Sequence, residues 1–195
     1  MRRLSKIAFI ACLGMLLLGG TASARSAYST YKKQDSVKIV TLLKEASRLK
    51  TKPKIWMLYF GKKFLGVPYV AGTLDAAKDE RLVINTTQLD CTTYVEMVVA
   101  LTRCAESKKY TFADYCEQLK HVRYIGGDVA YEKRQHYFTA WINDNVEEGI
   151  VTDIQVNPPF TSVQHINVNW MTTHQSSYKT VSYTHLRAHE TRHDL

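Results

Sequence analysis

The sequence predicts an α+β fold in which helices predominate, and three observations support this prediction. Apolar residues recur at helical spacing over residues 35–50, and the stretch that follows Cys91 is apolar on almost every face of a helix. The short apolar run at residues 82–84 lies between polar segments, which is typical of a strand. With 195 residues, of which 45% are hydrophobic and 23% charged, the chain has the composition of one globular domain.

The elements before Cys91 follow from spacing and from breaker residues. The first helix is expected over residues 35–50, behind a cap formed by Asp35 and Ser36. A mixture of aromatic and aliphatic residues then predicts a second helix, which must stop before Pro68 because proline disfavours helical geometry at the residue preceding it. The strand at residues 82–84 comes next.

The central helix is expected over residues 91–104, with Asp90 as its N-cap. Because it is apolar on nearly all sides, it should be the buried helix of the domain. Thr111 and Asp114 form a capping box that opens a further helix over residues 112–124.

Two more elements are expected toward the C-terminus. Residues 136–149 predict a helix that Gly149 ends, since glycine is the favoured residue just beyond a helix C-terminus. Residues 162–169 alternate between apolar and polar, which predicts one more strand.

The N-terminus predicts export. Three basic residues come first, residues 7–20 form an apolar stretch too short to span a bilayer, and an A-x-A cleavage signal follows at residues 22–24. We therefore expect residues 1–24 to be a signal peptide and the mature protein to be secreted or periplasmic. An uncleaved membrane anchor is the alternative.

The charge pattern limits the expected partners. The formal net charge is +8, but no basic run exceeds a Lys-Lys pair, so nucleic-acid binding has little support. No membrane partner is expected once the signal peptide is removed, and nothing in the pattern predicts a cofactor. The sequence does not indicate an oligomeric state.

Cys91 stands where a reactive thiol is expected. The thiolate is the nucleophilic form of cysteine, and the N–H groups of a first helical turn stabilise negative charge. Its neighbours Thr92 and Thr93 keep that turn polar. The alternative is a buried structural thiol.

Cys104 and Cys116 either bridge two consecutive helices or remain two separate buried thiols, and the usual burial of cysteine favours the second arrangement.

Several ordered segments resemble a known family. "LGVPYVAGTLD" and "LDCTTYVEMVVAL" are similar to the Pro-Tyr-x-x-Gly and Asp-Cys-[Ser/Thr]-x-[aromatic] blocks of the NlpC-type, papain-like cell-wall cysteine peptidases. The match is closer still to the N-acetylmuramoyl-L-alanine amidase-like family of exported proteins, whose members carry segments similar to "RQHYFTAWINDN", "GIVTDI" and "NVNWMTTHQSSYK". The resemblance covers residues 55–180.

The resemblance implies an enzyme that hydrolyses peptidoglycan or muropeptides. Cys91 would be the nucleophile and attack an amide carbonyl through a thioester. Tyr69 would orient the substrate or assist the oxyanion, although a core aromatic role is an equal alternative. Arg134 and His136 become substrate-binding candidates. The family name implies the bond between N-acetylmuramic acid and L-alanine, whereas the wider superfamily often cuts after D-glutamate.

The general base is missing from the pattern. The resemblance places it in a His-Val-Gly strand that does not occur in this chain, and neither His121, His165 nor His174 is a good substitute. We therefore expect residues 25–180 to be the helical half of a papain-like (NlpC-type) cysteine hydrolase fold, with most of the catalytic β-sheet missing. Such a truncated copy would be inactive, and would leave Val95 and Val99 partly exposed.

Residues 181–195 resemble translated adapter sequence and are expected to be a non-native tail. They contain "HETRH", whose histidines His189 and His193 have the spacing of zinc metallopeptidases. The tail offers no apolar face to pack this motif and no expected third ligand, so we predict no metal site. A non-catalytic cell-wall binding domain and a structural secreted protein are also compatible with the sequence.

Overall fold

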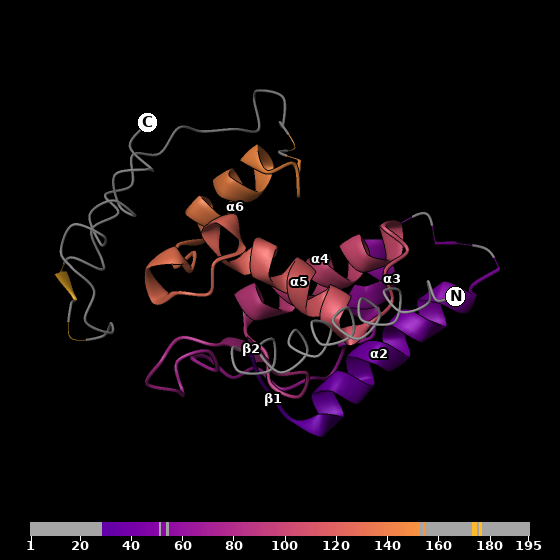
Figure 1. Cartoon of the computed structure of the whole chain (residues 1–195), viewed down its shortest axis with the longest axis horizontal. Coiled ribbons are helices and arrows are strands. Elements are labelled where there is room, and N and C mark those ends of the chain that lie inside the picture. The colour runs from indigo at the N-terminus through magenta and orange to yellow at the C-terminus, as the bar shows by residue number, and fades with distance from the viewer. Residues whose placement is uncertain are drawn as a thin grey trace, which may run out of the picture.

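The computed structural model describes residues 29–50, 52–53, 55–152, 154, 173–174 and 176, which form a mostly helical α+β arrangement (Figure 1). The elements are, in chain order, β1 (Ser29–Tyr31), α2 (Lys33–Arg48), α3 (Trp56–Lys62), β2 (Leu82–Ile84), α4 (Cys91–Glu106), α5 (Phe112–Arg123), the 3-10 turns η1 (Ile125–Gly127) and η2 (Tyr131–Lys133), and α6 (Phe138–Glu147). Among these residues no helix has the length and apolarity needed to cross a membrane.

Helix α4 lies at the centre of the fold, as predicted. Figure 1 shows it in the middle of the molecule behind α5, with α2 and α3 to one side and α6 to the other. Its residues from Glu96 to Ala105 are buried with the exception of Arg103, and Ala100, Leu101 and Cys104 have no exposed surface. A helix that is apolar on every face is stable only when other elements cover all of it.

Helix α5 is anchored to α4 and β2 by a buried charge pair. The Nε of Arg123 donates to Oε2 of Glu96 at 2.7 Å, and its Nη1 donates to the carbonyl of Val83 at 2.7 Å. The predicted capping box is confirmed at the start of α5, where the Asp114 N–H donates to the hydroxyl of Thr111 at 3.1 Å.

In the part of the chain that the structure describes, the sheet consists of two short parallel strands, with Ser29 opposite Leu82 and Tyr31 opposite Ile84. The sequence predicts β2 but not β1.

The predicted position of the N-cap of the first helix is wrong. Helix α2 begins at Lys33, and Asp35 lies buried in its first turn. Its Oδ2 accepts from the Lys32 N–H at 2.8 Å, as the third residue of a capping box does, and its Oδ1 accepts 2.8 Å hydrogen bonds from the N–H and hydroxyl of Thr86.

Helix α6 covers the opposite side of α4 through a small second cluster of buried residues, Val99, Val122 and Trp141. The expectation that Val99 would be exposed is therefore wrong, because Trp141 packs over it; Val95 is partly buried. The predicted end of α6 is confirmed, with Gly149 at a φ of 67°. The predicted signal peptide, the strand at residues 162–169 and the tail lie outside the described residues.

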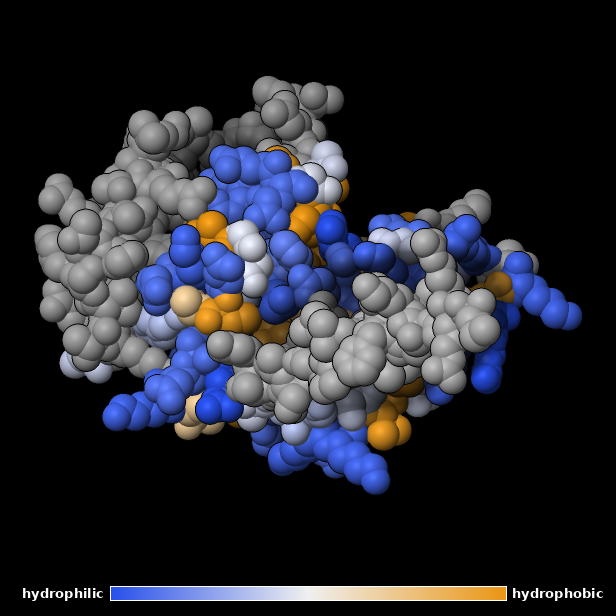
Figure 2. Space-filling model, viewed as in Figure 1, coloured by the Kyte–Doolittle hydropathy of each residue, from blue (hydrophilic) through white to orange (hydrophobic). Residues whose placement is uncertain are grey.

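The visible face carries hydrophobic residues in separate patches between hydrophilic ones (Figure 2). Exposed large apolar residues are not evenly distributed along the chain. Four of them lie within or beside α3: Ile55, Met57, Leu58 and Leu65. Helix α3 therefore differs from α4, whose apolar side chains are covered by its neighbours.

Candidate active site

Cys91 is the first residue of α4 and its side chain is exposed. The predicted cap is confirmed: Oδ1 of Asp90 accepts from the Thr93 N–H at 2.8 Å and from the Thr93 hydroxyl at 2.7 Å. In return the Asp90 N–H donates to the Thr93 hydroxyl at 2.9 Å. These reciprocal bonds fix the helix start, and thereby the direction in which the Cys91 side chain leaves the backbone.

The first turn of α4 can stabilise negative charge. N–H groups in this turn have no acceptor within the helix, and the helix dipole adds positive potential at the same end. Of the N–H groups in this turn, the Asp90 carboxylate accepts from that of Thr93. The arrangement leaves the backbone N–H of Cys91 suitable as a donor to an oxyanion that forms beside its own sulfur.

Tyr69 lies beside Cys91, as the resemblance implied. The Leu89 N–H donates to the Pro68 carbonyl at 3.1 Å and the Val70 N–H donates to the Leu89 carbonyl at 3.0 Å, so the two segments run together. The side chain of Tyr69 is 70% exposed, which argues against the alternative of a core aromatic.

The two residues share a shallow pocket of about 250 Å³, which is lined by Phe64, Val67, Tyr69, Leu89, Asp90, Cys91 and Tyr94. Its walls are mostly apolar and aromatic, and the polar groups are the thiol, one carboxylate and two phenol hydroxyls. Such a site suits a small ligand held by apolar contact beside a few polar groups.

The sequence did not suggest Phe64 or Tyr94 as site residues. Tyr94 follows Cys91 by three positions, so both lie on one face of α4, and this spacing was the available signal. Its ring packs edge-on against Phe64, with centroids 6.5 Å apart. Gly61 makes room for Tyr94, since a Cβ at that position would lie 2.8 Å from the phenol oxygen.

Arg134 and His136 do not line this pocket. Arg134 is buried and pairs through Nη2 with Asp75 at 2.5 Å and through Nη1 with Glu80 at 3.4 Å. Nε2 of His136 lies 2.9 Å from the Tyr131 carbonyl. These contacts tie η2 to the loop that follows Tyr69. Substrate binding by either residue stays a prediction.

The described histidines have local partners. His121 lies 3.6 Å from Oε1 of Glu117, one turn earlier on α5, and His174 lies 2.9 Å from the Thr173 hydroxyl. No imidazole is among the described residues that line the Cys91 pocket. Within the same residues there is no group of three or more side chains able to hold a metal. His165 and the HETRH segment lie outside them.

Cys104 and Cys116 are unbridged, which favours two separate thiols over a disulfide. Cys104 is fully buried and Cys116 is partly buried. Burial disfavours the thiolate and raises the pKa of both Cys104 and Cys116 to about 12.

Comparison with known proteins identifies the type of domain. The model of the N-acetylmuramoyl-L-alanine amidase-like (AmiA-like) family matches residues 59–191, a range that contains every residue lining the Cys91 pocket. No curated protein matches the chain.

Three solved structures share this part of the fold. An N-acetylmuramoyl-L-alanine amidase from Bacteroides uniformis is 30% identical, with a TM-score of 0.59, and the match covers 77% of this chain and 61% of that one. A second structure with the same name and organism is 28% identical, with a TM-score of 0.57 and the same two coverages. A Bacteroides fragilis protein provisionally named a xylanase is 31% identical, with a TM-score of 0.59 and coverages of 71% and 61%.

The chain thus spans about three fifths of the length of the solved structures that it matches. The match to the family model extends over more than half of the sequence, and the exposed cysteine at the start of the central helix lies inside it. The chain belongs to the N-acetylmuramoyl-L-alanine amidase-like family.

Proposed function

We propose that this protein is an exported, cysteine-dependent hydrolase of peptidoglycan amide bonds, with Cys91 as its nucleophile. One observation carries the proposal: the exposed thiol of Cys91 begins a capped helix and shares a pocket with Tyr69. Family membership supports a cell-wall substrate. The helical arrangement around α4 is compatible with the helical half of a papain-like fold.

The proposed chemistry follows from the pocket. The Cys91 thiolate attacks the carbonyl carbon of the amide, a C–S bond forms, and the carbonyl oxygen takes up the negative charge. In this proposal the Cys91 N–H and the Tyr69 hydroxyl donate hydrogen bonds to this oxygen. When the C–N bond breaks, the leaving amine takes a proton from solvent water. A water molecule then attacks the thioester carbonyl, the C–S bond breaks, and the carboxylic acid leaves as the Cys91 thiol is regenerated.

The general base is assigned to no residue. His121 and His136 are engaged with Glu117 and Tyr131, and neither lines the pocket. General acid–base catalysis contributes on the order of a hundred- to ten-thousand-fold, so a chain without a base would turn over slowly. The sequence-based expectation of an inactive copy stays an untested prediction, and the proposal made here differs from it by allowing a low residual rate.

Glycoside hydrolysis is the competing chemistry raised by the name of the Bacteroides fragilis structure. That reaction usually needs two carboxyl groups facing each other across the bond that is cut. Among the described residues the Cys91 pocket has one carboxylate, Asp90, and its Oδ1 is engaged in capping α4. Amide hydrolysis by the thiol therefore fits the pocket better.

A substrate-like electrophile tests the nucleophile without depending on a complete set of catalytic groups. We expect an N-acetylmuramoyl-L-alanyl chloromethyl ketone to alkylate Cys91 faster than a simple acetyl-alanyl chloromethyl ketone, as measured by peptide mapping. Cys104→Ala is the matched control and should leave labelling unchanged. Equal rates for the two reagents would contradict recognition of the muramoyl group.

Purified sacculi test the reaction itself. We expect slow release of peptides, detected by mass spectrometry, that stops in Cys91→Ala and persists in Cys104→Ala. Release that survives Cys91→Ala would refute the proposed nucleophile. If the wild-type chain and Cys91→Ala bind sacculi equally and neither releases peptides, this chain binds the cell wall without hydrolysing it, and the proposed activity is refuted for this chain.

A further inference from the structure

Helix α3 has apolar side chains on two opposite faces. One face enters the core through residues at helical spacing, Trp56, Phe60 and Phe64. On the other face Leu58 is 56% exposed, and Ile55, directly before the helix, is 60% exposed; Leu65, three residues beyond the end of α3, is 77% exposed. A surface helix normally directs polar residues toward water, and an apolar exposed face marks an interaction site.

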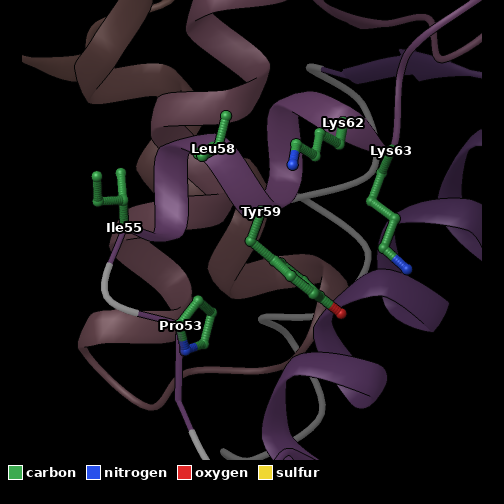
Figure 3. Close-up of a pocket in the computed structure, with 6 residues that line it drawn as sticks. All are labelled: Pro53, Ile55, Leu58, Tyr59, Lys62 and Lys63. Carbon is green, nitrogen blue, oxygen red and sulfur yellow. The ribbon is translucent and has the colours of Figure 1, made fainter.

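The exposed face contains a shallow groove of about 440 Å³, lined by Pro53, Ile55, Leu58, Tyr59, Lys62 and Lys63. Figure 3 shows its polarity: Pro53 and Ile55 lie at one end, both lysines lie at the other, and Tyr59 lies between them. The groove therefore has an apolar end and a cationic end.

The groove is lined by two lysines, and the stretch of sequence that contains it is rich in basic residues. Residues 44–65 contain seven basic residues and one acidic residue, Glu45. Glu45 is already bonded to Nζ of Lys63 at 2.8 Å, and Lys62 is exposed. The face is thus complementary to an anionic partner that also offers apolar surface.

We propose that the α3 face, defined as Ile55, Leu58, Lys62, Lys63 and Leu65, docks on a membrane surface that contains anionic lipids. Aliphatic side chains that protrude from a helix surrounded by lysines are the features by which peripheral proteins enter the headgroup region. A soluble polyanion would satisfy the lysines and leave the aliphatic side chains in water. The sequence led us to expect no membrane partner, and the exposed face is the reason for revising that expectation.

Docking would bring the Cys91 pocket close to the membrane. The chain passes directly from the α3 face at Leu65 into Val67 and Tyr69, which line that pocket. The protein would then meet its ligands at the membrane surface. This inference does not depend on Cys91 being catalytic.

Tryptophan probes test the contact at single positions in the full chain. We expect fluorescence of a Leu58→Trp variant to be quenched by vesicles of phosphatidylglycerol and brominated phosphatidylcholine, more strongly than fluorescence of the unsubstituted chain. Val37→Trp is the matched control, because Val37 is 55% exposed on α2 and outside the α3 face. Its quenching should equal that of the unsubstituted chain. Because both variants retain residues 1–24, any membrane contact of that apolar segment is common to both.

Charge variants test the anionic requirement. A lysine near an anionic surface contributes roughly a fivefold factor in binding, so Lys62→Gln should lower the vesicle partition coefficient about fivefold. Lys78→Gln, an exposed lysine outside residues 44–65, should leave it unchanged. The unsubstituted chain should bind vesicles of phosphatidylcholine alone less tightly than vesicles that contain phosphatidylglycerol.

Three results would overturn the proposal. Equal quenching of Leu58→Trp and Val37→Trp would show that the α3 face does not reach the lipid. The face would be a polyanion site if the chain bound soluble polyphosphate, Leu58→Ser left that binding unchanged, and lipid did not quench the Leu58→Trp fluorescence. A dimer in sedimentation experiments that Leu58→Ser converts to monomer would show that a second copy occupies the face.

Discussion

The two ends of helix α4 carry the same residue type in opposite environments. At its start Cys91 is exposed beside a polar first turn, and Asp90 caps the helix. Near its end Cys104 is fully buried in the core. The chemical role of a cysteine on α4 therefore depends on whether it lies at the start of the helix or near its end. Of these two cysteines, Cys91 has access to solvent and to the unpaired backbone donors of the first turn, and Cys104 is buried.

The largest expected difference between the two ends is in thiol reactivity. Because burial raises the pKa of Cys104 and Cys116 to about 12, only about one molecule in 10⁵ carries either thiolate at pH 7. Iodoacetamide with peptide mapping should therefore label Cys91 at least a hundredfold faster. Above pH 7, any labelling of the buried thiols should rise about tenfold per pH unit while the protein stays folded. Faster labelling of Cys104 than of Cys91 would reverse the comparison.

The next effect concerns the buried side of α4, which the Glu96–Arg123 pair holds against α5. Arg123→Met leaves a buried carboxylate without its partner and should lower the free energy of unfolding by about 3 to 5 kcal/mol in urea titrations. The double variant Glu96→Gln/Arg123→Met should recover part of this loss. The Cys91 labelling rate in the folded variant should stay the same, and a parallel loss of labelling would show that the two ends are coupled.

A matched pair of substitutions compares the two ends directly. Cys104→Ser buries a hydroxyl in the apolar core and should cost about 1 to 3 kcal/mol of unfolding free energy. Cys91→Ser places the same hydroxyl in solvent and should change stability by less than about 0.5 kcal/mol. Equal costs, measured by chemical denaturation, would mean that the two sites are not as different as their exposure indicates.

Local sequence signals predicted α4 and its surroundings well. Asp90, Thr111 and Gly149 act through hydrogen bonds or backbone geometry within a few residues, and all three were placed correctly. Asp35 was misplaced as the N-cap. It is the third residue of α2, where Oδ2 accepts from the Lys32 N–H, and its other carboxylate oxygen is bonded to Thr86, which lies 51 residues away and leaves no local signal. β1 was missed because three residues give no periodicity, and its stability comes from pairing with β2.

Local sequence blocks predicted two residues of the candidate pocket, and they could not predict long-range ion pairs. Cys91 and Tyr69 belong to the two most specific blocks, and they line one pocket. Arg134 was chosen by its place in a similar segment, yet its guanidinium is paired with Asp75 and Glu80, which precede it by more than fifty residues. Long-range ion pairs of this kind leave no local signal in the sequence.

The smallest expected effect separates the two functions of Asp90, which caps α4 and places a negative charge in the Cys91 pocket. Asp90→Ala removes the acceptor of the Thr93 N–H and should lower the free energy of unfolding by about 1 kcal/mol. Asp90→Asn keeps an oxygen at the cap and should cost only a few tenths of that, since asparagine caps helices about as well as aspartate.

The same two variants have different expected effects on the thiol. Asp90→Asn removes a like charge from the pocket, so iodoacetamide should label Cys91 at least as fast as in the unsubstituted chain. Asp90→Ala removes that charge too, but it also loosens the first turn whose N–H groups stabilise a thiolate, so labelling should be slower than in Asp90→Asn. If the two variants label Cys91 at the same rate, the order of the first turn does not contribute to thiol reactivity, and the start of α4 differs from its end by exposure alone.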